Sequence, residues 1–316
     1  MNIRHSGLLF VAVLFGLCLA ACGDQTAAEH KPRVALVMKA LSNEFFKTME
    51  DGARAHAAAN PELYELRASG IPNEQDVSGQ IKLVNDLIGQ RVDAIVIAPA
   101  DSKSLIPVCH KAVEAGIVVV NIDNRFDADA LKASGLAIPF VGPDNRAGAR
   151  LAGEYIAAKL QAGDEVIIVE GLPTAYNAQQ RKAGFEDAIA AHQLKIGASQ
   201  TGKWETDEAR KVVASLLPGH QAVKAVLCAN DTMAIGAAAA LKAADRTDVL
   251  VAGFDNIKAV QDLIGQGRVL CTVDQHGDQI AVFGIQHALD ILVKRSGMAD
   301  KSTAVDLVTA PAARKP

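Results

Sequence analysis

The stretch VDAIVIAPADSKSLIPVCHKAVEAGIVVVNI, residues 92–122, decides the fold class of this chain. It begins with a short, continuously apolar run at 92–98 and ends with a second one at 117–122. Between them, residues 104–115 have the apolar spacing of a helix. Strands that are apolar along their whole length are typical of a parallel sheet covered by helices on both faces. The stretch therefore predicts a β-α-β unit of an α/β protein.

The same alternation continues on both sides of this stretch. Towards the N-terminus, strands are expected at 33–38 and 64–68 and helices at 43–59 and 74–90. After Gly142 the pattern restarts, with helices expected at 145–160, 177–192, 207–217, 232–244, 258–265 and 279–295, and strands at 165–169, 195–200, 222–227, 249–253, 268–273 and 303–308. The sequence thus predicts an α/β fold of two doubly wound parallel-sheet domains.

Composition narrows the possible classes of function. The chain has 316 residues, 50% hydrophobic and 22% charged, so it can bury a large core. Its formal net charge of −4 gives no strong positive field for nucleic acid or an anionic membrane. The long apolar run lies at the N-terminus, so a polytopic membrane protein is excluded.

The N-terminus has the pattern of an exported protein. Residues 1–21 combine a basic start with an apolar run too short to span a bilayer comfortably, which predicts a signal peptide. It ends in Leu-Ala-Ala-Cys-Gly at 19–23, which resembles the bacterial lipobox, and that resemblance implies lipidation of Cys22. The alternative is a buried thiol after a plain signal peptide. Residues 22–31 are expected to be a lipidated tether and residues 311–316 a tail.

Three cysteines remain in the body of the chain, at Cys109, Cys228 and Cys271. Their number is odd, their spacings are wide, and no C-x-x-C motif occurs. We expect buried free thiols rather than a disulfide framework, although an exported compartment would permit disulfides.

Polar side chains follow the predicted strands in both halves of the chain. Ligands of open parallel sheets bind outside the carboxyl ends of the strands. Aspartate, arginine and amide side chains suit vicinal hydroxyls, and flat aromatic rings suit the C–H faces of a sugar. The residues concerned are Asn43, Phe45, Phe46, Asp123, Asn124, Arg125, Arg181, Asn230, Asp231, Asp255, Asn256, Asp274 and Gln275.

Each of these positions has an alternative interpretation. Asn43, Asn230 and Asp255 precede predicted helices, where Asn and Asp cap free N–H groups. Asp123 suits a turn, and Arg181 suits an exposed helix surface.

Several segments together resemble the ribose-binding-protein family, the periplasmic sugar receptors of ABC importers. They are SNEFFKTMEDGA (42–53), NIDNRF (121–126), GPDNRAGARLAGEYI (142–156), AQQRKAGFEDAI (178–189), CANDTMAIGAAAAL (228–241), VAGFDN (251–256) and CTVDQHGDQIA (271–281). The resemblance implies sugar binding by Asn43, Phe46, Asp123, Arg181, Trp204, Asn230, Asp255 and Gln275, with Phe45 at a stacking position. It covers nearly all of the chain after the tether.

The chain departs from the ribose-specific pattern at several positions. Glu44 stands where proline is usual, and Asn124 stands where the ribose receptor has arginine, with Arg125 one residue later. Trp204 replaces a phenylalanine, and the Tyr176-Asn177 pair changes the loop before Arg181. These departures weaken the case for ribose itself and leave a sugar or polyol as the expected class of ligand.

The resemblance also implies an organisation and partners. Domains are expected at 32–142 plus 276–302 and at 143–275 plus 303–310, joined by a hinge of three crossings near 123–142, 275–277 and 302–304. The expected protein is a lipid-anchored monomer on the periplasmic side of a bacterial envelope. Its partners would be a small sugar or polyol, an ABC permease and, as a further option, a chemoreceptor, with no nucleic acid.

Other classes of function have less support in the sequence. A transcriptional regulator is disfavoured by the signal peptide and by the lack of a helix-turn-helix segment before Arg33. No nucleophile elbow, zinc-protease, P-loop or dinucleotide motif supports an enzyme, and no cofactor or metal is expected from the dispersed histidines. A receptor of the same fold for an autoinducer-like furanose, a nucleoside or an acidic sugar remains the main alternative.

Overall fold

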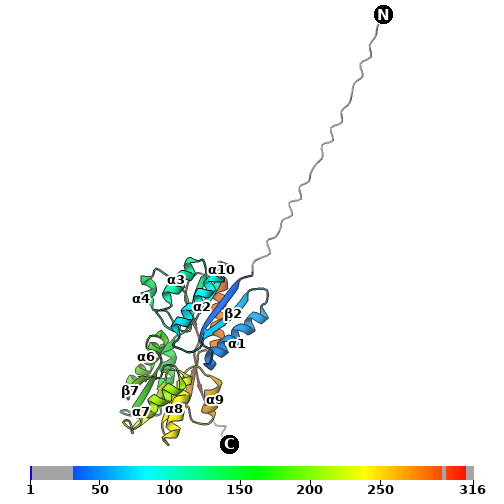
Figure 1. Cartoon of the computed structure of the whole chain (residues 1–316). Helices are drawn as coiled ribbons and strands as arrows, with labels where there is room; N and C mark the ends of the chain where they lie inside the picture. Colours follow the sequence, from blue (N-terminus) through cyan, green and yellow to red (C-terminus); the bar gives the residue numbers. More distant parts are fainter. Residues whose placement is uncertain (2–30, 294–296, 311–316) are drawn as a thin grey trace. The chain divides into compact units, whose positions relative to one another are not determined.

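The computed structural model describes Met1, residues 31–293 and residues 297–310. It contains two six-stranded sheets, with strand orders β11-β5-β4-β3-β1-β2 and β12-β10-β9-β8-β6-β7. All described strand pairs are parallel except β10 with β12. The predicted α/β fold of two doubly wound parallel sheets is therefore confirmed (Figure 1).

The first sheet and its helices are called the first lobe below. Its strands are β1 (Arg33–Ala40), β2 (Glu65–Ile71), β3 (Ala94–Ile97), β4 (Val118–Ile122), β5 (Phe140–Pro143) and β11 (Lys301–Thr303). Its helices are α1 (Glu44–Ala59), α2 (Val77–Gly89), α3 (Ile106–Glu114), α4 (Ala128–Ala133) and α10 (Gly277–Leu292). Helices α1 and α10 pack together on one side of the sheet, and α2 and α3 pack together on the other.

Strand β1 shows why this lobe has two cores. Leu36 and Met38 belong to one hydrophobic cluster, and the alternating Ala35 and Val37 belong to another. All four side chains are fully buried. Because successive side chains of a strand point to opposite faces, a strand covered on both faces must be apolar throughout. This is the physical reason for the continuous apolar runs in the sequence.

The second sheet and its helices are called the second lobe. Its strands are β6 (Glu165–Glu170), β7 (Lys195–Thr201), β8 (Val223–Cys228), β9 (Leu250–Ala252), β10 (Cys271–Asp274) and β12 (Asp306–Thr309). Its helices are α5 (Asn145–Ala157), α6 (Tyr176–Ala191), α7 (Thr206–Leu216), α8 (Asp231–Ala243) and α9 (Lys258–Gly265). Helix α5 packs against α6, and α7 packs against α8.

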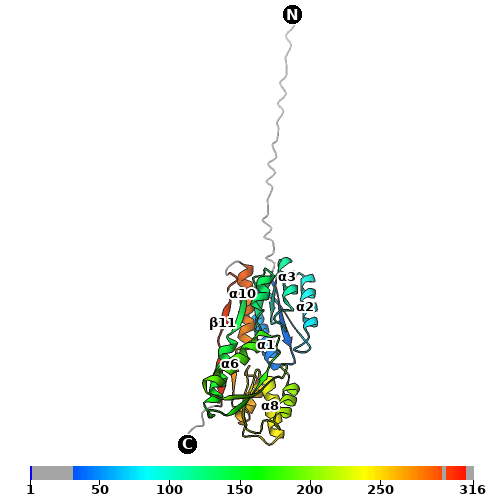
Figure 2. The ribbon, with the colours of Figure 1, turned by 90° about the vertical axis from the view of Figure 1, so that its left-hand side faces the viewer.

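The chain passes between the two sheets three times. It leaves β5 of the first sheet at Pro143 and enters α5 of the second lobe at Asn145. It returns between β10, which ends at Asp274, and α10, which contacts β3 and β4. The third passage separates β11 from β12, which are only two residues apart in the sequence yet belong to different sheets. In Figure 2, β11 runs beside α10.

Three local predictions were incomplete. The single strand expected at 303–308 is in fact two short strands, because the chain changes sheets between Thr303 and Asp306. Strand β5 and helix α4 were not predicted. Both are short, and β5 ends in a proline, so neither has enough residues to show a period.

The cysteine prediction is confirmed for the body of the chain. Cys109, Cys228 and Cys271 are free and buried. Burial raises the pKa of Cys109 and of Cys271 to about 12, so neither forms a reactive thiolate readily. Within the described residues, no helix is long and apolar enough to cross a membrane. The expected signal peptide and Cys22 lie outside the described residues.

Candidate functional site

A cavity of about 240 Å³ lies where the two lobes meet. Its lining comes from both lobes and consists mostly of buried polar and aromatic side chains: Lys39, Asn43, Phe45, Phe46, Glu74, Asp123, Asn177, Arg181, Trp204, Asn230, Asp255 and Gln275. Almost all of these residues lie at or just after the carboxyl end of a strand. Both sheets therefore direct their ligand-binding edges at one common space.

Nine of the predicted ligand-binding residues line this cavity. They are Asn43, Phe45, Phe46, Asp123, Arg181, Trp204, Asn230, Asp255 and Gln275. The others, Asn124, Arg125, Asp231, Asn256 and Asp274, do not line it.

Asn124 and Arg125 point away from the cavity because the chain turns sharply after Asp123. The Asn124 side chain is fully buried, and its amide donates to the Pro99 carbonyl at 2.9 Å. Arg125 pairs with Asp300 at 2.8 Å and lies over the Phe140 ring, with 4.3 Å from its guanidinium carbon to the ring centroid. The structure thus gives Asn124 and Arg125 contacts within the protein rather than positions in the cavity wall.

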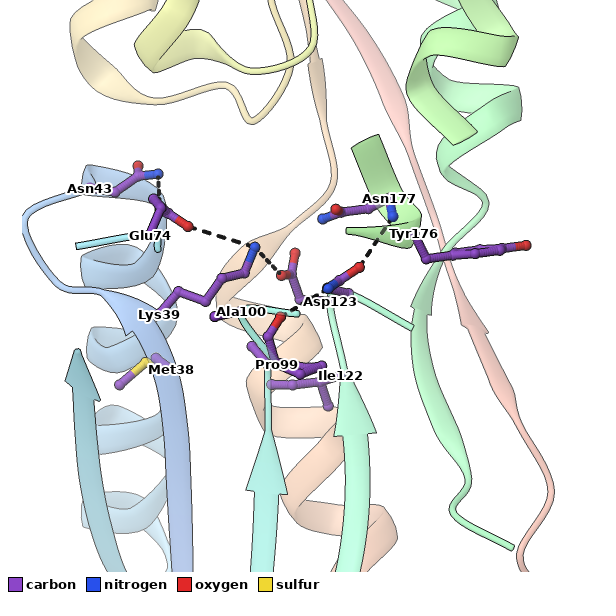
Figure 3. Close-up of polar contacts among 12 residues, drawn as sticks. Met38, Lys39, Asn43, Glu74, Pro99, Ala100, Ile122, Asp123, Tyr176 and Asn177 are labelled. Carbon is purple, nitrogen blue, oxygen red and sulfur yellow. Dashed lines mark hydrogen bonds and ion pairs between the residues drawn. The ribbon is translucent and has the colours of Figure 1, made fainter. Parts of the chain in front are cut away.

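Lys39 brings a positive charge into the first-lobe side of the cavity (Figure 3). Its ammonium lies 3.7 Å from a Glu74 carboxylate oxygen and 3.6 Å from an Asp123 carboxylate oxygen. Asn43 donates from its side-chain amide to Glu74 at 3.1 Å. Burial raises the pKa of Glu74, and Lys39 and Asn43 oppose this shift. The four side chains form one buried polar network.

Sequence reasoning missed Lys39, Glu74 and Asn177. Lys39 is the penultimate residue of β1, and Glu74 follows β2 by three residues. The rule about carboxyl ends applies to both, but the predicted strands ended at 38 and 68, too early to point to them. Asn177 lies in the first turn of α6, where the chain re-enters the cavity after β6.

Arg181 is the centre of the second-lobe side. It is buried, and it donates to the Ala229 carbonyl at 2.9 Å, to Asn145 Oδ1 at 2.8 Å and to Asp255 Oδ1 at 3.4 Å. Gln275 donates to the same Asp255 oxygen at 2.6 Å. Burial raises the pKa of Asp255 well above its usual range, while the positive charge of Arg181 opposes the shift.

Aromatic rings cover both sides of the polar network. Phe45 and Phe46 pack edge to face at a centroid distance of 5.1 Å. The Lys39 ammonium lies 5.6 Å from the Trp204 ring centroid, and the Arg181 guanidinium carbon lies 5.7 Å from it. Gly171 leaves room for the indole, since a Cβ atom there would lie 2.1 Å from the ring. The rings give the cavity flat apolar walls between its charges.

Five buried polar atoms in the cavity wall have no hydrogen-bond partner in the structure. Four are acceptors, namely Glu74 Oε2, Asp123 Oδ2, Asn177 Oδ1 and Gln275 Oε1, and the fifth is the donor Trp204 Nε1. Buried polar groups are nearly always hydrogen-bonded, because leaving one unpaired costs about 1–3 kcal/mol. A ligand that satisfies these atoms must therefore carry several O–H or N–H donors.

Three residues of the same wall have a strained backbone conformation. Asp123, Trp204 and Asp255 have positive φ angles of 59°, 68° and 124°, a region that residues with a side chain rarely adopt. Such strain costs of order 1–3 kcal/mol per residue and clusters at functional sites. These three side chains thus face the cavity from strained backbone conformations.

The helix-cap alternative is correct for two residues and wrong for a third. The side-chain oxygen of Asn43 accepts from Phe45 N at the start of α1, and that of Asn230 accepts from Met233 N at the start of α8. Both also line the cavity, so capping and cavity lining coincide. Asp255 caps no helix, since α9 begins at Lys258 after Ile257.

The cavity has no metal-binding character. Among the residues that the structure describes, no group of three or more His, Cys, Asp or Glu side chains could hold a metal ion. The carboxylates of the wall are instead interleaved with Lys39 and Arg181.

Comparison with known proteins identifies the family to which this chain belongs. Residues 34–296 match the family described as periplasmic binding protein domain. The chain is 50% identical to the D-ribose/D-allose-binding protein of Pseudomonas aeruginosa over 311 residues, covering 96% of this chain and 98% of the relative.

Two solved structures have the same fold. An ABC transporter solute binding protein from Burkholderia multivorans is 51% identical, with a TM-score of 0.86 over 88% of this chain and 99% of the other. A second, from Actinobacillus succinogenes and bound to D-allose, is 35% identical, with a TM-score of 0.83 over 88% and 98%.

Proposed function

Because the chain belongs to the family of periplasmic binding protein domains, we propose that it is the solute receptor of an ABC importer. It binds one molecule of a neutral sugar or polyol in the cavity between the lobes and delivers it to a membrane permease. The observation that carries this proposal is the set of unpaired polar atoms in the cavity wall.

The hydrogen-bonding capacity of those atoms determines which chemical groups a bound ligand must carry. Four acceptors of the wall lack a hydrogen bond, and two of them, Glu74 Oε2 and Asp123 Oδ2, have only the Lys39 ammonium near them, at 3.7 and 3.6 Å. Several donors on one small molecule would satisfy these acceptors. Hydroxyl groups supply such donors and also accept from Trp204 Nε1 and from the Arg181 guanidinium. A compound with many hydroxyls satisfies the wall without bringing a charge into it.

Size and shape support a monosaccharide. The cavity is small, about 240 Å³. The rings of Phe45, Phe46 and Trp204 offer flat surfaces for the C–H faces of a sugar ring.

The charge of the wall disfavours an anionic ligand. Two cations, Lys39 and Arg181, face three carboxyl groups, those of Glu74, Asp123 and Asp255. No positive excess remains to neutralise a phosphate or the carboxylate of an acidic sugar. The two relatives named above, one for D-ribose and D-allose and one bound to D-allose, agree with a neutral sugar.

The structure is the closed form in this proposal. Hydrogen bonds join the lobes beside the cavity, for example from Thr232 Oγ1 to Asn43 Oδ1 at 3.4 Å and from Ser102 N to the Thr174 carbonyl at 3.2 Å. The lobes act as two domains that open about the three chain passages to admit and release the ligand.

The proposed location follows from the sequence and the family. The protein acts as a monomer on the periplasmic side of the envelope, and a lipid on Cys22 holds it at the membrane. The family supports the compartment, while the lipid anchor rests on the sequence motif at 19–23.

A thermal-shift screen of pentoses, hexoses, polyols, nucleosides and sugar acids tests the proposal. A ligand at one hundred times its Kd adds about 2.7 kcal/mol to the free energy of unfolding, which is readily seen as a rise in Tm. We expect a neutral monosaccharide or polyol to give the largest rise, with one-to-one stoichiometry by calorimetry. A rise given only by nucleosides or sugar acids would contradict the proposed ligand class.

A further inference from the structure

Several helices of this protein begin without a side-chain cap of their own. Among the described helices they are α3, α6, α7, α9 and α10. The first N–H groups of any helix lack partners within the helix and need acceptors from elsewhere. In α6 and α9, both of the second lobe, those acceptors come from the first lobe.

Helix α9 is capped by Glu44. One Glu44 carboxylate oxygen accepts from Lys258 N at 2.9 Å, and the other accepts from Ala259 N at 3.5 Å. The residue before the helix, Ile257, has no side-chain acceptor to offer. Glu44 is also the first residue of α1, so its negative charge lies at the N-termini of two helices, where the helix dipoles favour it.

Helix α6 is capped by two residues that follow strands of the first lobe. Tyr176 N donates to Ser102 Oγ at 2.9 Å, and Asn177 N donates to Asn124 Oδ1 at 3.2 Å. Ser102 Oγ donates to the same Asn124 oxygen at 3.3 Å. In Figure 3, Asn177 lies next to Asp123, and the Tyr176 side chain points away from it.

We propose that Glu44 and the Ser102–Asn124 pair determine ligand affinity by capping α9 and α6 across the cleft, and only when the cleft is closed. They are positioning residues, because none of the three lines the cavity. The two capped helices follow β6 and β9, which β8 separates in the sheet, so the lobes are held at two separate points. This inference rests on the proposed function in that a ligand closes the cleft.

The caps across the cleft should raise ligand affinity by stabilising the closed state. Opening the cleft would break all four capping bonds and leave the helix N–H groups to water, so the caps favour the closed state. A ligand's apparent affinity scales with the fraction of protein in the competent state. Loss of a cap should therefore weaken every ligand by the same factor and act mainly on dissociation.

Glu44→Ala is the main test, measured by calorimetry and stopped-flow dissociation with each sugar or polyol that the parent binds. Removing a helix cap predicts a rise in Kd of about 2- to 30-fold, equal for all ligands and caused by faster release. Glu44→Gln keeps one acceptor and should recover much of the affinity. Ser102→Ala tests α6 in the same way. Asp51→Ala, on the exposed side of α1 with 63% side-chain exposure, is the matched control.

Three outcomes would overturn the inference. Parental Kd and dissociation rate in Glu44→Ala would mean that the cap adds nothing to closure. A changed ranking among sugars would mean that Glu44 contacts the ligand. An equal loss of Tm with and without ligand would make the cap a feature of both states.

The inference and the proposed function fail separately. If the parent binds no sugar or polyol, the proposed function fails, and distances between spin labels decide the capping question in the unliganded protein. Labels on Lys82→Cys in α2 and Asp207→Cys in α7 suit this, because both side chains are more than three-quarters exposed. Glu44→Ala should then lower the closed population. A variant with the parental population, or a parent without any closed population, would overturn the inference.

Discussion

The guanidinium of Arg181 and the carboxylate of Asp255 lie 3.4 Å apart, with side chains exposed by only 2% and 4%. They come from α6 and from the loop after β9, and each is the nearest countercharge of the other. Removing one member of a buried pair leaves the other uncompensated, which typically costs 3–5 kcal/mol of stability. A test of their role in binding must therefore measure stability without ligand as well as affinity, and a substitution that keeps the shape of the side chain avoids an added cavity.

Asp255→Asn keeps that shape and removes the charge. A charge-assisted hydrogen bond to a ligand hydroxyl contributes about 1.5–3 kcal/mol, so we expect affinity to fall roughly ten- to a hundredfold. Calorimetry measures the affinity, and Tm without ligand shows whether the protein stays folded. Asp207→Asn on α7, with 78% side-chain exposure, is the control. If Asp255→Asn kept the parental affinity, Asp255 would serve only as the countercharge of Arg181 and would not bind the ligand.

Trp204 is the single tryptophan of the chain, so its fluorescence reports on the cavity alone. Its side chain is buried in the closed form, with Nε1 unpaired. Ligand should change its emission and protect it from acrylamide. Trp204→Phe should keep part of the affinity, since a flat ring remains. Trp204→Ala should lose more, and the void it leaves costs about 3–5 kcal/mol of stability. Unchanged quenching at saturating ligand would speak against a ligand contact.

Lys39 separates the Glu74 and Asp123 carboxylates, and its removal should expose their repulsion. We expect Lys39→Met to lower the free energy of unfolding by about 3–5 kcal/mol and to weaken ligand binding. Lys39→Met combined with Glu74→Gln removes a charge of each sign and should regain part of the loss. Urea unfolding of the parent, both single variants and the double variant measures this coupling. Lys82→Met, exposed by 77%, is the control, and strictly additive effects would refute the network.

Asp231 predicts a pH dependence of stability. Burial raises its pKa from the usual 3.8 to about 7, although Thr272 Oγ1 at 2.6 Å and Ile257 N at 2.9 Å donate to it. The folded state thus binds a proton more tightly than the unfolded state. The resulting stability is present below about pH 4 and is lost as the pH rises to about 7. Tm should fall between about pH 4 and about pH 7, and the fall should be smaller in Asp231→Asn. An equal fall in both proteins would contradict the assignment.

Cys22 predicts membrane attachment. Replacing it with serine removes the thiol that a lipid would modify, so Cys22→Ser should release the protein from membranes or block its maturation. Fractionation and gel mobility measure this, with Cys109→Ser as a control for loss of a thiol elsewhere. A Cys22→Ser variant that fractionates and migrates like the parent would rule out the lipid anchor.

The rule about carboxyl ends of strands recovered much of the cavity wall from sequence alone, because a parallel sheet gathers those ends on one edge. It failed where direction within a loop matters. Asp123 and Asn124 are neighbours, yet Asp123 faces the cavity while Asn124 turns back to the Pro99 carbonyl. The positive φ of Asp123 causes this division, and no residue pattern encodes it.

The limits of the predicted strands explain the other misses. Lys39 lies outside the strand predicted from sequence because a lysine interrupts the apolar run, whereas β1 continues through it to Ala40. Its charge is tolerated in the core only through Glu74 and Asp123, and both partners are distant in sequence. A contact between residues so far apart depends on the tertiary fold and cannot be inferred from local spacing.

The placement of β11 and β12 has a consequence for the order of synthesis. Each forms an edge of a different sheet, and both come from the last stretch of the described chain, residues 301–309. Neither lobe is therefore a contiguous segment that could be expressed whole by itself. During translation, neither sheet can complete its set of strands until nearly the entire polypeptide has emerged. The topology thus delays completion of both sheets until residues 301–309 have been made.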